Sequence, residues 1–123
     1  MSVIGEKLGE MSGRITTITV TEAGAAANCE WDSGELGTIL ETATFCPSVD
    51  ATGAPGTVSS RSQAVLPDGT TLTYASGGTW RSVGPQRWEV KLINLASTGD
   101  RVFTVETWHL KTHTTEAVLY ALD

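Results

Sequence analysis

The sequence is a series of short alternating runs, rich in β-branched and aromatic residues, that turn-forming residues interrupt at close intervals. The clearest interruption is Pro67-Asp68-Gly69, which separates a run ending at Leu66 from one beginning at Thr70. Pro presets its own φ, Asp accepts hydrogen bonds from nearby backbone, and Gly tolerates positive φ. Short strands with turns roughly every 8–12 residues are typical of an all-β domain.

This pattern predicts a single small antiparallel up-and-down β-barrel of about eight strands, with a β-sandwich as the alternative. Closure into a barrel removes the exposed edges of the sheet. Gly77-Gly78 and Gly84-Pro85 are interpreted as turns, and residues 48–55 as a loop. Residues 113–122 are compatible with a ninth strand or a C-terminal helix, and we favour the strand. The strands before them are expected over residues 14–22, 26–31, 37–45, 57–66, 70–75, 79–83, 88–95 and 102–110.

The length of 123 residues suits one domain. Residues 1–123 are therefore interpreted as a single β-barrel domain, in which the glycine-rich residues 1–12 form an irregular lead-in. The net charge is −6 and there is no basic stripe, so nucleic acid is not an expected partner. No clustered Lys and Arg or long apolar run suggests a membrane, and the N-terminus does not resemble a secretory signal. A cytoplasmic location is the expectation.

The sequence has no motif for metal, nucleotide or nucleophilic chemistry, and no cofactor is expected. His109 and His113 are expected to flank a turn rather than share a helix face, so we predict no metal site. There is no Gly-x-Ser-x-Gly elbow and no phosphate-binding glycine loop. Cys29 and Cys46 are either two reduced thiols or a cross-strand disulfide.

Alternation assigns the two faces of the strand that begins near Trp88. Arg87, Glu89 and Lys91 share a solvated face, so Trp88 and Asn94 are expected to point into the barrel. Asn94 is then a polar residue at an inward position, unless a bend returns it to solvent.

The strand over residues 102–110 is apolar on both faces. The barrel core can cover only one of them, so a terminal segment or a second subunit is expected to cover the face that carries Phe103 and Val105. We favour the second subunit and predict a homo-dimer. A lone exposed Phe would need no such explanation.

Glu106 lies between Thr104 and Trp108 on that strand and is the candidate catalytic residue. Burial against Trp raises the pKa of a carboxyl group, which is how general acids are made. The alternative is an exposed glutamate, or one that pairs with Arg61 or Arg81.

The sequence contains four tryptophans, and three of them occur on expected strands in its second half. Large aromatic side chains fill small barrel cores efficiently, and they also form walls of pockets for apolar ligands. If the barrel has such a pocket, the candidate ligand-binding residues are Tyr74, Trp80, Trp88, Asn94 and Trp108.

The segments Gly78-Thr79-Trp80 and Arg87-Trp88-Glu89 resemble those of small calycin-type and allene-oxide-cyclase-like barrels, in which turns alternate with Trp-bearing strands. The resemblance covers about residues 13–110, and the Gly-x-Trp motif that lipocalins carry near the N-terminus is absent. The resemblance does not assign a catalytic role to any residue of this sequence. It implies a barrel that binds small apolar molecules, and some barrels of this kind are cofactor-free cyclases.

Three functions remain open at this point. The first is binding of a small, largely apolar molecule inside the barrel. The second is a cofactor-independent cyclase or isomerase in the same cavity, with Glu106 or Tyr74 as the proton-transfer group. The third is an oligomeric structural or interaction module whose barrel is filled by its own side chains.

Overall fold

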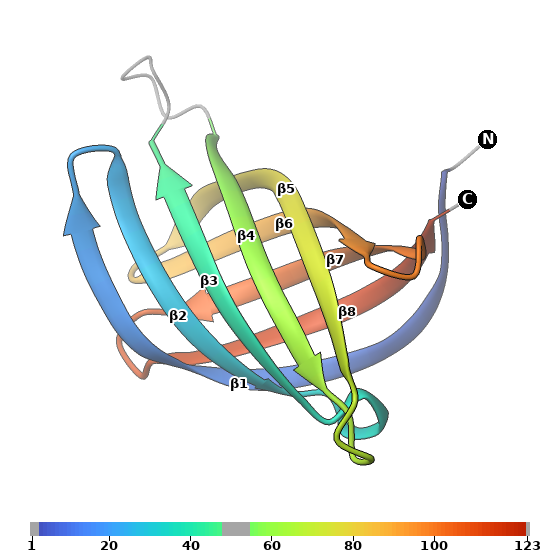
Figure 1. The fold of residues 1–123 in the computed structure, drawn as a ribbon. Helices are drawn as coiled ribbons and strands as arrows, with labels where there is room; N and C mark the ends of the chain where they lie inside the picture. The colour runs from blue at the N-terminus through green and yellow to red at the C-terminus, as the bar shows by residue number, and fades with distance from the viewer. Residues whose placement is uncertain (1–2, 48–54, 123) are drawn as a thin grey trace.

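Eight strands form a closed antiparallel barrel in the structure, a computed structural model that describes residues 3–47 and 55–122 (Figure 1). Each strand pairs with the next along the chain, and β1 also pairs with β8. The predicted all-β up-and-down barrel is confirmed, and the sandwich alternative is excluded. The strands are β1 (Ile4–Thr21), β2 (Gly24–Asp32), β3 (Thr38–Cys46), β4 (Gly56–Val65), β5 (Thr71–Gly84), β6 (Arg87–Ala96), β7 (Arg101–His109) and β8 (Thr114–Leu122).

Several local predictions are confirmed. The Pro-Asp-Gly turn is closed by the Leu66 backbone N–H, which donates to the carbonyl oxygen of Thr70 at 2.8 Å, and Gly69 has a φ of 89°. The C-terminal segment is the strand β8 and not a helix. Both cysteines are free, so the disulfide alternative is wrong. Of the loop expected over residues 48–55, all but the last residue lies outside the described part of the chain.

One short 3-10 helix, Gly34–Leu36, connects β2 to β3. No helix among the described residues is long and apolar enough to cross a membrane.

The irregular lead-in predicted over residues 1–12 is wrong, because β1 already begins at Ile4. This half of β1 pairs with β8, with Met11 opposite Ala117 (blue beside red in Figure 1). The partner strand, β8, lies at the other end of the chain, so no pattern within residues 4–12 predicts this pairing. Gly13 permits close approach to both neighbouring strands, since a Cβ there would lie 2.5 Å from the carbonyl oxygen of Glu30 on β2 and 2.7 Å from the Thr115 hydroxyl on β8.

Gly77-Gly78 is not a turn but the middle of β5, so the fifth and sixth expected strands are one long strand. Figure 1 shows that β5 bends sharply along its length. The two glycines lie opposite Ile93 and Leu92 of β6. A Cβ on Gly78 would overlap the carbonyl oxygen of Lys91, so the glycine is needed here for close approach of two strands.

An aromatic plug, made of Phe45, Trp80, Trp88 and Trp108, fills one end of the barrel. The Phe45 ring centroid lies 5.8, 5.0 and 5.1 Å from those of the three tryptophans. Phe45 and Trp108 are 1% exposed, while Trp80 and Trp88 are half-buried. The plug occupies the end at which β5 turns into β6 and β7 into β8.

The outer face of β7 is partly covered within the same chain. Phe103 lies beside Tyr120 of β8, with ring centroids 6.3 Å apart, and both Phe103 and Val105 are half-buried. Ile93, opposite Phe103 on β6, is 54% exposed. The homo-dimer stays a prediction, which sedimentation of the protein at tens of micromolar concentration tests.

Candidate functional site

Two glutamates point into the barrel from opposite parts of the wall. Glu41 on β3 is 7% exposed and Glu106 on β7 is 2% exposed. Alternation places each of them among inward-facing neighbours, as in the burial pattern of β3, where every second residue is buried. Every Lys and Arg of the chain lies in the described residues and is exposed, so neither carboxyl group has a basic partner inside.

Glu106 is held by hydrogen bonds to both carboxyl oxygens. The Trp108 indole N–H donates to Oε1 at 2.9 Å, and the Thr104 hydroxyl donates to Oε2 at 3.2 Å. The network continues to Asn94, whose amide donates to Thr104 Oγ1 at 3.1 Å and accepts from the Ser76 hydroxyl at 2.6 Å. Asn94 therefore stays inside, and the alternative that a bend returns it to solvent is wrong.

Glu41 has fewer partners. The Trp31 indole N–H donates to its Oε1 at 2.9 Å, and no other hydrogen bond of good geometry reaches Glu41 from the described residues. The Ser60 hydroxyl is buried and makes no hydrogen bond of good geometry either, although it is close enough to Glu41 to lower the pKa of that carboxyl group. Hydrogen-bonding capacity is therefore left over on this side of the interior.

Burial raises the pKa of both carboxyl groups. For Glu106 the pKa is raised well above its ordinary value, first by burial and then by the negative charge of Glu41, against the hydrogen bonds from Trp108 and Thr104. For Glu41 burial again outweighs the hydrogen bond from Trp31 and the weaker effect of the nearby Ser60 hydroxyl. Two interacting carboxyl groups titrate as a pair, so ionisation of one of them disfavours ionisation of the other.

A cavity of about 60 Å³ lies against both carboxyl groups, in the half of the barrel away from the aromatic plug. We call this half the cavity end. Tyr74 and Leu119 are among several lining residues that keep partial exposure, so the cavity lies close to solvent at this end. The residues that line it are Met11, Trp31, Ile39, Glu41, Ser62, Tyr74, Asn94, Val102, Thr104, Glu106 and Leu119.

The structure separates the candidate site residues into two groups. Tyr74, Asn94 and Glu106 line the cavity. Trp80, Trp88 and Trp108 do not, because they pack against Phe45 in the aromatic plug. The expectation that at least two of these tryptophans form the cavity wall is therefore wrong. Large rings pack best on one another, and the three strands carry them to the same end of the barrel.

Neither of the arginines considered as a partner for Glu106 reaches it. Arg81 pairs with Glu89, with Nε 3.3 Å from Oε1, and Arg61 is exposed on β4. The ion-pair alternative for Glu106 is wrong.

Sequence reasoning missed Glu41 and Trp31. Glu41 occupies an inward position between Ile39 and Ala43, so strict alternation along β3 was a signal that could have found it. Trp31 is at the end of β2, where face assignment from a short run is weak. It is the tryptophan that lines the cavity.

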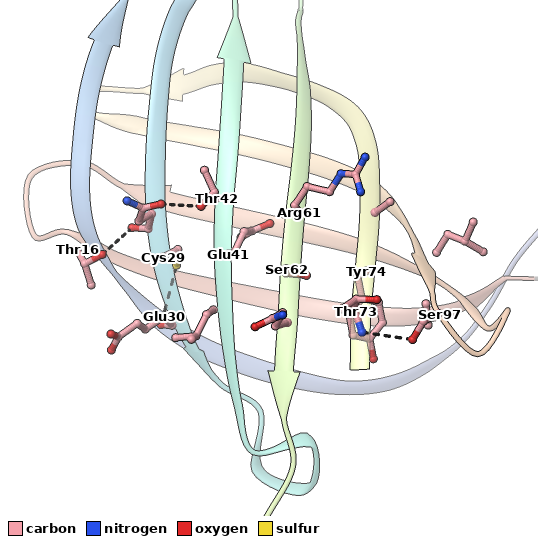
Figure 2. A pocket seen from close by; sticks show the side chains of 16 residues that line it. Thr16, Cys29, Glu30, Glu41, Thr42, Arg61, Ser62, Thr73, Tyr74 and Ser97 are labelled. Carbon is pink, nitrogen blue, oxygen red and sulfur yellow. Dashed lines mark hydrogen bonds between the residues drawn. The ribbon is translucent and has the colours of Figure 1, made fainter. Parts of the chain in front are cut away.

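A second, larger hollow of about 880 Å³ lies on the outer face, across β1 to β6 (Figure 2). Most of its lining residues are exposed, and they include the polar side chains of Thr42 and Arg61. The Asn28 amide oxygen accepts a hydrogen bond from Thr42 at 2.7 Å, and its nitrogen donates to Thr17 at 2.7 Å. These groups satisfy one another. The buried titratable residues that also line this hollow, Cys29 and Glu41, occupy inward positions on their strands. The interior is the stronger candidate site.

Comparison with protein-family models, with curated proteins and with solved structures gives no match to this chain. Among the residues that the structure describes, no three His, Cys, Asp or Glu side chains gather into a group that could hold a metal ion.

Glu106 should make the stability of the protein decrease as pH rises. The folded state holds the proton at a pH where the unfolded chain, with a pKa near 4.5, has lost it. This stabilisation is complete below that pKa and is lost as pH rises through the raised pKa of the folded state. Each pH unit of the difference contributes about 1.4 kcal/mol. We expect Glu106→Gln to flatten the profile and to be more stable than the wild type at pH 8.

Urea denaturation at pH 4, 6 and 8 measures this effect. Glu10→Gln, at an exposed glutamate on β1, is the control that should follow the wild type. Parallel profiles for wild type and Glu106→Gln would show that Glu106 titrates normally.

Proposed function

We propose that the barrel binds a small, largely apolar molecule at its cavity end, with the polar group of the ligand seated on Glu41 and Glu106. The observation that carries the proposal is a pair of buried carboxyl groups, without a basic partner, facing a cavity. Buried titratable groups with strongly perturbed pKa values in a concave site mark candidate functional sites. Apolar side chains such as Ile39 and Val102 form the rest of the wall.

The size of the cavity limits the ligand. About 60 Å³ accommodates a few water molecules and is far below the roughly 300–1,000 Å³ of pockets for drug-sized ligands. The ligand is therefore compact, or inserts only its head group. A larger head group requires Met11, Tyr74 or Leu119 to change rotamer, and Met is the most adaptable of these side chains.

A second candidate function is cofactor-independent isomerisation or cyclisation of such a molecule. The same pair supports it, because a protonated carboxyl group can donate a proton while an ionised neighbour accepts one. The Tyr74 hydroxyl, which accepts and donates no hydrogen bond to the described residues, is a third proton-transfer group on the same cavity wall. A substrate that exchanges a proton would contact both glutamates.

Binding is tested with n-butanol and the indole N–H signals of the four tryptophans in an NMR spectrum. We expect butanol to shift the signal of Trp31, which lines the cavity, and to leave that of Trp80 in the plug unchanged. Val102→Phe should fill the cavity and abolish the shift.

The matched control is Val65→Phe, since Val65 is 37% exposed on the outer face and should leave butanol binding intact. An unchanged Trp31 signal at every butanol concentration that the fold tolerates would contradict the proposal. That result would favour the third hypothesis, a barrel filled by its own side chains.

A further inference from the structure

We propose that the ligand of the cavity end carries a protonated amino group, which Glu41 and Glu106 bind directly. This inference rests on the proposed function and specifies the chemical class of its ligand. The acidic side chains inside the barrel have no cationic partner in the chain.

The interior holds two buried carboxyl groups without a basic partner. All Lys and Arg side chains are exposed, and Arg14, Arg81 and Lys91 form ion pairs with exposed or half-buried glutamates on the outer face. A buried carboxylate without a partner is costly, so the ionised form of the pair is stabilised most by a cation from outside the chain.

The interior also has acceptor atoms to spare on the Glu41 side. Glu41 accepts one indole hydrogen bond, and Ser60, 5% exposed and also buried next to Glu41, has a hydroxyl without a hydrogen-bond partner. An ammonium group has three N–H donors and no acceptor. Its donors therefore match the carboxyl oxygens of Glu41, which line the cavity and accept one hydrogen bond of good geometry among the described residues.

The neighbouring thiol does not compete for this role. The Cys29 Sγ lies 3.3 Å from the Thr115 hydroxyl, and burial raises the pKa of the thiol to about 12. Cys29 is therefore uncharged at neutral pH, so the two glutamates are the acidic groups that can bind a cation at the cavity. Tyr74, which also lines the cavity, has a pKa raised by burial and by Asp100 and is neutral as well.

The wall of the cavity favours an organic cation over a metal ion. Two carboxyl groups are too few for a hard cation such as Ca²⁺, which takes about 6–8 oxygen ligands. Met11, Ile39 and Leu119 line the same cavity and would contact an alkyl chain. A primary alkylamine has a cationic head that can bind the two glutamates and an apolar tail that can contact these side chains.

The test compares n-butylamine with n-butanol, which has the same length and no charge, by the Trp31 indole signal. At pH 8 we expect butylamine to bind at least about tenfold more tightly, the effect of one charge-assisted hydrogen bond. Its affinity should rise between pH 6 and pH 8, because the bound amine requires the pair to release a proton, while the affinity of butanol should stay constant.

Glu41→Gln and Glu106→Gln should each reduce butylamine binding to the level of butanol, and Glu30→Gln, on the outer face, should not. Butanol binding with no preference for the amine would overturn this inference and leave the proposed function standing. Butylamine binding that is independent of pH and of both substitutions would also overturn it. Failure of both ligands to shift Trp31 would overturn the inference and the proposed function together.

Discussion

Replacing Trp108 with alanine should lower the free energy of unfolding by about 3–5 kcal/mol, the range for removing a large buried aromatic side chain. Trp108 is 1% exposed and lies in an edge-to-face contact with Phe45 at 5.1 Å. The substitution leaves a cavity in the plug. It also removes the indole N–H that donates to Glu106, so a buried carboxyl group loses one of its two donors.

Two further variants separate these contributions in urea denaturation followed by far-UV circular dichroism. Trp108→Phe keeps much of the packing and removes the N–H, so we expect a smaller loss of stability. Trp88→Ala should also cost less than Trp108→Ala, because Trp88 is only half-buried. Equal losses of stability for Trp88→Ala and Trp108→Ala would contradict the deeper burial of Trp108 in the aromatic plug.

Replacing Gly78 with alanine should cost about 3 kcal/mol or more, at the upper end of the range for overpacking. The added Cβ would overlap the backbone carbonyl oxygen of Lys91, and a backbone atom cannot move aside as a flexible side chain can. β5 and β6 would have to separate locally, with loss of ladder hydrogen bonds between them.

Gly77→Ala is a matched control one residue away. No atom lies within 4 Å of a Cβ built on Gly77, and Gly77 has no positive φ. The alanine there should be neutral or slightly stabilising, because it reduces the entropy of the unfolded chain. Thermal unfolding of the two variants should therefore give clearly different midpoints, and equal midpoints would contradict the register of β5 against β6.

Most of the fold could be predicted because strand and turn signals are local. Alternation in residues 87–95 oriented Trp88 inward, and turn chemistry at Pro67-Asp68-Gly69 located a hairpin. The errors occurred where the same local sequence is compatible with two different structures. Gly77-Gly78 suits a turn and equally a strand that bends beside a close neighbour. Residues 4–12 show no clear alternation of apolar and polar residues, and their pairing partner, β8, is distant in the sequence, so this strand was not predicted.

The candidate site was predictable only in part. Glu106, Tyr74 and Asn94 were identified because each is a polar group in a strand context, and all three line the cavity. Glu41 was missed, although its side chain is equally buried, because one glutamate within a single alternating strand is read most simply as solvent-facing. The tryptophans were wrongly expected in the cavity wall because residue type does not indicate the position of a side chain along the barrel axis.

The sequence by itself determined the class of fold, the turns and the inward direction of most side chains, since all of these depend on neighbours in the chain. Only the tertiary structure decided which inward side chains meet. Closure and strand register carry Trp80, Trp88 and Trp108 to one end and place Glu41 opposite Glu106 near the other. A carboxyl group acquires a raised pKa only from what surrounds it, so the chemistry of this pair exists in the folded barrel and not in the chain.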